Sequence, residues 1–268
     1  YEHIDPKISE GPCWARHRIQ NFYNDEDYYF QIDSHMQFES GWDQYLLGYM
    51  LKIRSDSNEF RKFPIISCYP RQFDVIDFEQ KKFRLLNEDK KTHTLAYRED
   101  SIFLKGSFSR QIGAISETEI THGYLLAAGC LFAPASFVRE VPYDPEFYFY
   151  GEEISLMLRA FTRGFSIFHI PAVPVFHLYT DISDIKRKLH WDEEEDRERS
   201  IKWHEREEKS IERLSKIIDG ELKGIYGLGD KRNLENYEFL SGIDFKARRV
   251  SNKNKAITAE FISSLSWK

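Results

Sequence analysis

The stretch at residues 28–38, YYFQIDSHMQF, constrains the fold of this chain more than any other. Aromatic and β-branched residues dominate its first half, and this composition favours a half-buried β-strand. The strand is expected to end at Asp33, because Asp33, Ser34 and His35 follow the apolar run directly. Chemistry in open α/β sheets gathers just beyond the carboxyl ends of strands, so this strand end is a candidate site.

Asp33 and His35 are both able to bind a metal ion. Residues i and i+2 of an extended segment project to the same side, so both side chains can face one ion while Ser34 turns away. The tripeptide fits a strand-end turn equally well, with Asp33 capping backbone amides and His35 on the surface. Two residues do not decide between these interpretations, and the rest of the chain has to be considered.

Helical and strand patterns alternate along the chain, which predicts an α/β fold. Residues 71–109 are rich in charge and alternate only weakly, so we expect antiparallel strands or excursions from the sheet there, including one strand at 101–108. The predicted helices lie at residues 13–23, 45–51 and 151–163, and the predicted strands at 28–32, 64–70, 124–132 and 165–171.

The composition of the chain changes at residue 184. Residues 184–220 are dense in helix formers and in opposite charges spaced by four, while their apolar residues are sparse and helically spaced. A solvated helix lying on the domain is the simplest interpretation. We therefore expect a catalytic domain at residues 1–183 and a charged helical extension with its tail at residues 184–268, packing on that domain.

Bulk composition argues against several functions. The 268-residue chain has a net charge of −6, whereas general nucleic-acid binding favours a basic surface. Three cysteines, Cys13, Cys68 and Cys130, form no motif and leave one unpaired, so a reducing, cytoplasmic compartment is expected. The most apolar stretch, residues 123–138, is too short to span a bilayer and is broken by a glycine and a proline, so no membrane segment is expected.

Two later elements supply further candidate site residues. Glu152 and Glu153 follow Gly151 at the start of a predicted helix, where the helix dipole favours acidic residues even without catalysis. His177 lies in an extended apolar segment, in which a lone histidine is more often a core or surface residue than a ligand. Each of these residues therefore has a structural interpretation beside the functional one.

Asp33, His35 and His177 together would suit sugar-nucleotide chemistry. A sugar nucleotide releases a diphosphate, and a divalent cation that bridges the two phosphates stabilises the departing charge. One carboxylate and one or two imidazoles leave coordination positions for phosphate oxygens. Imidazole ligands favour Mn²⁺, although Mg²⁺ also fits such chemistry.

Motifs along most of the chain resemble one enzyme family, namely ARHRIQ, DYYFQIDSHMQF, GWD, AAGCLF, YDPEFYFYGEEISLMLRAFTRGF and FHLY. They are similar to the cytoplasmic-type polypeptide α-N-acetylglucosaminyltransferases, which modify hydroxyproline, Thr or Ser, as on the adaptor subunit of SCF-type ubiquitin ligases. The polypeptide GalNAc transferases look like distant relatives, with the same Asp-x-His, a Gly-Glu element and a later metal histidine. The likeness extends from Gly11 to about Phe245.

The resemblance implies a GT-A glycosyltransferase with a Rossmann-like mixed sheet flanked by helices. Such an enzyme depends on a metal, retains the anomeric configuration and moves GlcNAc from UDP-GlcNAc to a hydroxyl of a polypeptide acceptor. The implied metal ligands are Asp33, His35 and His177, and the implied catalytic residues are Glu152 and Glu153. The implied donor-binding residues are Arg16, Asp33, Ser34 and Gly129.

One departure from the family pattern concerns the start of the chain. GT-A folds normally begin with a strand–helix–strand unit that holds the uracil and ribose, and residues 1–12 cannot supply it. We therefore expect that first unit to be missing from this sequence. The departure keeps two alternatives open, a metal-dependent phosphoesterase built on the same Asp/His cluster and a non-catalytic, glycosyltransferase-like binding module.

Overall fold

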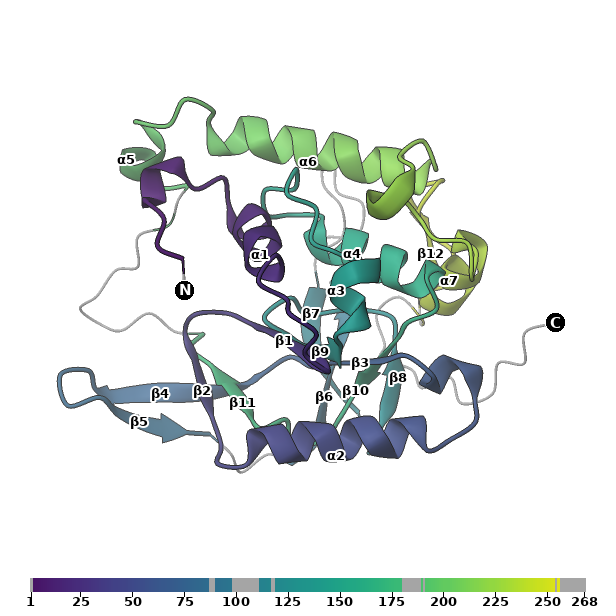
Figure 1. The fold of residues 1–268 in the computed structure, drawn as a ribbon, viewed down its shortest axis with the longest axis horizontal. Coiled ribbons are helices and arrows are strands. Elements are labelled where there is room, and N and C mark those ends of the chain that lie inside the picture. Colours follow the sequence, from purple (N-terminus) through teal and green to yellow (C-terminus); the bar gives the residue numbers. More distant parts are fainter. Residues whose placement is uncertain are drawn as a thin grey trace.

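The computed structural model describes residues 2–86, 90–97, 111–116, 119–179, 189, 191–253 and 255. Figure 1 shows mixed sheets in the middle of the molecule with helices on either side. The predicted α/β fold with a mixed sheet flanked by helices is therefore confirmed. None of the described helices is long and apolar enough to cross a membrane.

Five strands form the central sheet, in the order β1-β9-β3-β10-β8. Strands β3 and β10 run parallel, and the other neighbouring pairs are antiparallel. Every residue of β3 and β10 is buried, as expected for strands that are covered on both faces. The bounds are β1 Tyr28–Ile32, β3 Pro64–Ser67, β8 Thr121–Gly123, β9 Cys130–Pro134 and β10 Ser166–His169.

Alternate residues of these strands face opposite layers of helices. Ile65 belongs to the core cluster that contains α3 (Ser136–Glu140) and α4 (Glu152–Thr162), whereas Ile66 belongs to the cluster that contains α2 (Trp42–Arg54). This separation follows from the two-residue period of a strand. Figure 1 shows the same layers, with α2 on one side of the sheet and α3 and α4 on the other.

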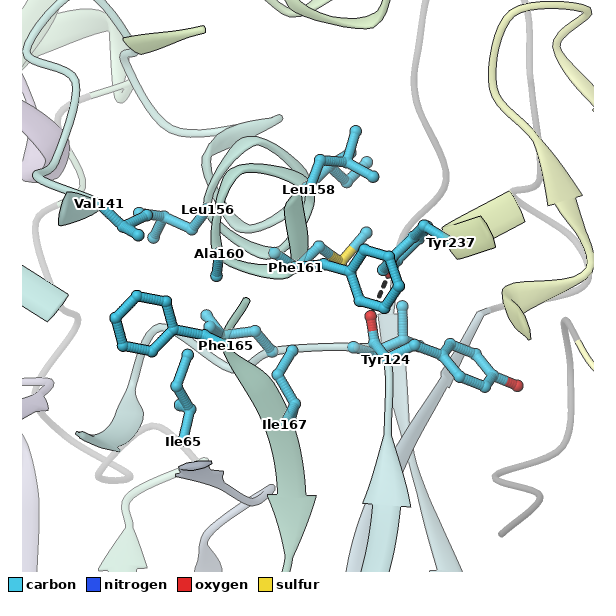
Figure 2. Packing of buried hydrophobic residues seen from close by; sticks show 14 of the residues in the cluster. Ile65, Tyr124, Val141, Leu156, Leu158, Ala160, Phe161, Phe165, Ile167 and Tyr237 are labelled. Atoms are coloured by element: carbon cyan, nitrogen blue, oxygen red, sulfur yellow. Dashed lines mark hydrogen bonds between the residues drawn. The ribbon is translucent and has the colours of Figure 1, made fainter. Parts of the chain in front are cut away.

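Helix α4 lies in the centre of the larger core cluster. Figure 2 shows Ala160 and Phe161 of α4 directed toward the sheet residues near Phe165 and Ile167. The same cluster contains the buried residues of α6 (Trp203–Ile218) and α7 (Leu234–Ser241), and the ring of Tyr237 on α7 lies 5.3 Å from that of Phe161. In the described part of the charged segment, α6 therefore contributes its buried residues to this cluster. The division of the chain at residue 183 into a catalytic domain and a helical extension stays a prediction.

A smaller sheet, in the order β2-β11-β4-β5, begins where the central sheet ends. The chain passes from one sheet to the other through residues 33–35, and β11 pairs antiparallel with β2, with His177 opposite Met36. The backbone N–H of Leu178 donates to the carbonyl oxygen of His35 at 3.1 Å. This register brings His177 beside His35. The bounds are β2 Met36–Phe38, β4 Arg71–Asp77, β5 Lys82–Leu85 and β11 Val175–His177.

The remaining elements are short and surround these two sheets. Strand β6 pairs antiparallel with β7, and β12 pairs antiparallel with β13. Their bounds, with those of the other helices and 3₁₀ turns, are α1 Pro12–Gln20, β6 Thr92–Tyr97, β7 Gln111–Ser116, α5 Glu193–Asp196, β12 Ile243–Asp244, β13 Arg249–Val250, and the turns Pro6–Ile8, Glu59–Arg61 and Gly224–Tyr226.

The expected strand at residues 124–132 is wrong in its first half, because β9 begins only at Cys130. The Oγ of Ser67 accepts a hydrogen bond from the backbone N–H of Ala127 at 2.9 Å, and Cys130 N–H donates to Ala127 O at 3.1 Å. These bonds hold a turn at residues 127–130 in place of a ladder. The strand expected at residues 101–108 lies outside the described residues.

Candidate active site

The three predicted metal ligands converge where the two sheets meet. One ligand atom from each of Asp33, His35 and His177 lies within 4.8 Å of the others. Asp33 follows β1, His35 precedes β2 and His177 ends β11, so the register of β2 with β11 creates the cluster. A plain surface turn at residues 33–35 does not account for this convergence.

The cluster offers a donor set and spacing that fit a divalent cation. His177 Nε2 lies 3.6 Å from Asp33 Oδ2, which is too far for a hydrogen bond but close enough for both atoms to reach one ion. The ring centres of His35 and His177 are 4.3 Å apart. Buried Nδ1 of His177 has no hydrogen-bond partner among the described residues. Imidazole and carboxylate ligands together suit first-row divalent metals.

The carboxyl of Asp33 is held in its charged form. Burial alone would raise the pKa of Asp33, but the imidazole of His177 and the guanidinium of Arg16 outweigh burial, and the pKa is lowered. Metal binding requires a deprotonated carboxylate. Asp33 is therefore ready to act as a ligand at neutral pH.

Arg16 on α1 bridges two carboxylates. Its Nη2 donates to Asp33 Oδ1 at 2.8 Å and its Nη1 donates to Glu152 Oε1 at 2.7 Å. The side chain is only 11% exposed, and its guanidinium lies 5.5 Å from the ring centre of Tyr143. Two of its N–H groups therefore bind protein carboxylates.

Gly129 provides the space that Asp33 occupies. A Cβ atom at position 129 would lie 2.6 Å from Asp33 Oδ2, which is closer than such atoms approach in proteins. The resemblance implies donor binding at Gly129, and the group that lies against it in the structure is this carboxylate.

Glu152 is the first residue of α4 and is nearly enclosed, with 7% of its surface exposed. Its Oε1 accepts from Arg16, and its Oε2 accepts from the thiol of Cys13 at 2.8 Å. Burial raises the pKa of Cys13, and the negative charge of Glu152 adds to this effect, so Cys13 remains a protonated donor. Both oxygens of Glu152 are thus bound to side chains of α1.

Glu153 has different surroundings. Its Oε1 accepts from the backbone N–H of Ala128 at 2.8 Å, and its Oε2 accepts a short hydrogen bond from Gln111 Nε2. Burial raises the pKa of Glu153 to about 7, and the charge of Glu152 contributes in the same direction. Near neutral pH this carboxyl therefore exists in both protonation states, which suits a group that exchanges protons.

A cavity of about 520 Å³ joins these groups. Asp33 and Gly129 line it next to the Asp33–His35–His177 cluster, and Glu152 and Glu153 line it at the start of α4. The volume is in the range of small-molecule sites in proteins. The other lining residues are Arg16, Tyr69, Leu95, Gln111, Ala127, Ala128, Phe149, Tyr150, Gly151, Ile154, Trp203, Glu207 and Ile211.

Comparison with known proteins identifies the family to which this site belongs. Residues 1–247 match the family model described as Glycosyltransferase (GlcNAc). The chain belongs to this glycosyltransferase family. The predicted membership of a GlcNAc-transferase family is confirmed, and no curated protein matches the chain.

In this glycosyltransferase the charged helix α6 supplies a wall of the cavity that sequence reasoning missed. Trp203, Glu207 and Ile211 line the cavity at a spacing of four residues, which places them along one stripe of the helix. That spacing was visible in the sequence. It did not single out a site, because the same residues also fit a helix that only packs on a domain.

The aromatic residues of the loop before α4, at positions 143–150, form a buried group and a group that lines the cavity. Tyr143, Phe147 and Tyr148 are at most 5% exposed and belong to the interior of the transferase. Phe149 and Tyr150 line the cavity and are 36% and 45% exposed, and the ring of Phe149 lies 5.6 Å from that of Trp191.

The cavity lining differs from the predicted site residues at Ser34 and Gln111. Ser34 is exposed, with its Oγ 3.4 Å from His35 Nδ1, and it is not among the residues that line the cavity. Gln111, which the sequence did not single out, lines the cavity and binds both Glu153 and the carbonyl oxygen of Leu126, the latter at 2.9 Å. No local sequence signal marks Gln111, because its position depends on the pairing of β6 with β7.

Proposed function

We propose that this glycosyltransferase moves GlcNAc from UDP-GlcNAc to a hydroxyl group of a polypeptide, on hydroxyproline, Thr or Ser, with retention of anomeric configuration. We propose further that a divalent cation, Mn²⁺ in preference to Mg²⁺, is held by Asp33, His35 and His177. Membership of the GlcNAc family supports the transferred sugar. The motif resemblance is the support for the donor nucleotide, the stereochemistry and the acceptor.

The observation that carries the proposal is the position of Asp33. This residue belongs both to the Asp33–His35–His177 cluster and to the lining of the 520 Å³ cavity. A diphosphate bound at the cluster would therefore have its sugar directed into the cavity. When bound there, a divalent cation supplies positive charge that stabilises the leaving diphosphate.

The residues of the chain would divide the remaining tasks. Gly129, which lines the cavity, would serve donor binding by leaving room for the Asp33 carboxylate beside the donor. Ser34, next to the proposed metal ligands, would contact the diphosphate. Glu152 and Glu153 supply the carboxylates at the sugar, and Glu153 is the better placed to exchange a proton near neutral pH.

The acceptor would enter from the side of α6 and the loop before α4. Phe149, Tyr150 and Trp203 offer aromatic surface at this side of the cavity, and aromatic rings bind both apolar peptide groups and the faces of sugars. The three cysteines are buried and unpaired, which supports the proposed cytoplasmic location.

The test is turnover of UDP-GlcNAc by the purified chain with Mn²⁺, with Mg²⁺ and with a chelator, in the presence of peptides containing hydroxyproline, Thr or Ser. The proposal expects UDP release and a GlcNAc-modified peptide with Mn²⁺, and neither product with chelator. Asp33→Ala should abolish both, because it removes the residue shared by metal cluster and cavity. Asp43→Ala is the matched control, since Asp43 is an exposed carboxylate on α2.

Unchanged turnover in Asp33→Ala would contradict the proposal. Cleavage of UDP-GlcNAc to UMP and GlcNAc 1-phosphate without sugar transfer, with two ions bound per chain, would favour a phosphoesterase, because two-metal hydrolases place two ions about 3.5–4 Å apart. Among the described residues, Asp33, His35 and His177 are the one group found to suit an ion, which argues for the transferase. Failure to bind either UDP or metal would favour a non-catalytic module.

A further inference from the structure

We propose that the adjacent glutamates have separate functions, and that Arg16 and Glu152 form a positioning unit that orients Asp33 while Glu153 faces the substrate. The inference rests on the proposed function of the site and assigns roles within it. It replaces direct donor binding by Arg16, and the role of Glu152 as a carboxylate at the sugar, with an effect of both residues on the metal ligand.

Arg16 binds Asp33 and Glu152 with one planar group. A guanidinium is planar and stays charged at any pH that the fold survives, so its N–H groups hold their partners in a fixed arrangement. Nη2 binds Oδ1 of Asp33 at 2.8 Å, and Oδ2 of the same carboxylate is the atom nearest His177, at 3.6 Å. Arg16 therefore occupies one oxygen of Asp33 and leaves the other for the ion.

Both carboxylate oxygens of Glu152 accept hydrogen bonds from side chains of α1. Cys13 and Arg16 are three residues apart on α1, so they lie on the same face of that helix and reach Glu152 together. The start of α1 is itself fixed, because Gly11 has φ +113° and a Cβ there would lie 2.8 Å from the ring of Tyr148. With 7% of its surface exposed, Glu152 serves as the anchor of Arg16.

Glu153 has different hydrogen-bond partners from Glu152. Its hydrogen-bond donors are a backbone N–H and a neutral amide, from Ala128 and Gln111, and the positive charge of Arg16 acts on it without a hydrogen bond and only weakly. Residues Glu153 and Gln111 both line the cavity, and Gln111 also binds the carbonyl of Leu126. Gln111 thus orients Glu153 toward the cavity in the way that Arg16 orients Asp33 toward the ion.

The decisive variant is Arg16→Lys, because it keeps the positive charge but cannot bind two carboxylates in one plane. Mn²⁺ binding to the full chain, without nucleotide, is measured by electron paramagnetic resonance, and thermal unfolding checks the fold. Groups that orient metal ligands typically change metal affinity 10–100-fold when replaced. We expect Arg16→Lys and Glu152→Gln to weaken Mn²⁺ binding by about tenfold. Glu153→Gln should keep wild-type Mn²⁺ affinity and lose UDP-GlcNAc turnover.

Arg54→Lys and Glu194→Gln are the controls, since both residues are exposed and neither makes a described contact with the site. Wild-type Mn²⁺ affinity in Arg16→Lys, with weaker UDP binding, would overturn the inference and restore Arg16 as a donor-binding residue. Equal loss of Mn²⁺ affinity in Glu152→Gln and Glu153→Gln would overturn the separation of the two glutamates.

A wild-type chain that binds no Mn²⁺ would instead contradict the proposed metal dependence. In that case the linkage is tested by a double-mutant cycle of Asp33→Asn with Glu152→Gln, read from unfolding midpoints. Non-additive shifts would retain the coupling of Asp33 to Glu152 through Arg16, and additive shifts would overturn it. A parallel cycle with Glu153→Gln is expected to be additive.

Discussion

The two sides of the cavity are built by different means. On the side of the Asp33–His35–His177 cluster, Arg16 donates hydrogen bonds shorter than 3 Å to Asp33 and to Glu152, and the Asp33 carboxylate lies against Gly129. On the α6 side, Trp203, Glu207 and Ile211 line the cavity, and two of these three side chains are apolar. Charged groups in fixed geometry tolerate little change, whereas apolar surface adapts. Substitutions on the side of the cluster should therefore have large effects, and those on the α6 side smaller ones.

The largest effect is expected from His177→Ala. Loss of a ligand should exceed the roughly 10–100-fold cost of losing an orienting group, so Mn²⁺ affinity should fall by at least about a hundredfold. Calorimetric titration with Mn²⁺ measures this change. His3→Ala, which removes an exposed histidine, is the control. Wild-type Mn²⁺ affinity in His177→Ala would show that the cluster does not bind the ion.

Gly129→Ala should have the next largest effect. The added Cβ would meet Asp33 Oδ2 at 2.6 Å, so the carboxylate has to move away from its position beside His177. We expect Mn²⁺ affinity and UDP-GlcNAc turnover to fall by about tenfold, as for other changes that displace a ligand. Gly48→Ala on α2 is a matched control, because a Cβ there meets nothing within 4 Å and alanine favours a helix. Equal behaviour of the two variants would contradict the importance of the Asp33 position.

Glu153→Gln should change how stability depends on pH. The folded state raises the pKa of Glu153 from 4.5 to about 7, so it holds this proton more tightly than the unfolded chain does. The resulting stabilisation is present at low pH and is lost as pH rises through about 7. The variant should therefore be more stable than wild type at pH 8, by at most about 3 kcal/mol, with the gap closing toward pH 5.

Urea unfolding at pH 5, 6, 7 and 8 measures that difference. Glu194→Gln is the control, because Glu194 is exposed and should give a pH dependence like that of wild type. A constant difference between Glu153→Gln and wild type across this range would exclude a raised pKa at Glu153.

The smallest effect is expected from Trp203→Ala, on the adaptable side. The change removes aromatic surface from the cavity wall. The hydrogen bond from the backbone N–H of Trp203 to Asp196 Oδ1 at 3.0 Å does not use the Trp203 side chain and persists. Transfer to peptide should fall about three- to tenfold, because an aromatic contact is worth about 0.5–1.5 kcal/mol, and it should fall more than UDP-GlcNAc hydrolysis does. Comparison of the two rates is the measurement.

Phe239→Ala, which removes an exposed ring on α7, should change neither rate. If Trp203→Ala lowers hydrolysis as much as transfer, the α6 wall serves the donor and not the acceptor.

The same contrast explains which parts of the site could be predicted from the sequence. Asp33 and His35 stand two residues apart at a strand end, and Glu152 and Glu153 open a helix, so local patterns mark them. His177 becomes a candidate only in combination with the others, because its position depends on the register of β2 with β11. Gln111 and Trp203 reach the cavity through long-range packing, and no local sequence pattern marks either of them as a site residue.

The fold shows the same limit. Strand and helix patterns predicted β1, α2, β3 and α4, since hydrophobic periodicity acts within each segment. The strand expected from residue 124 failed because Ser67, on another strand, binds Ala127 and turns the chain. That hydrogen bond joins residues far apart in sequence, and a reading of one segment at a time does not include it.

The pairing of β2 with β11 also has a consequence for folding. Since His35 and His177 become neighbours only once this pairing exists, an ion that needs both would bind the native chain and ignore the unfolded one. Such an ion would join His35 to His177 and so close the long loop between them. Its binding free energy would add to the stability of the whole domain. The concentration of free metal in the cell would then set the lifetime of the folded protein as well as its activity.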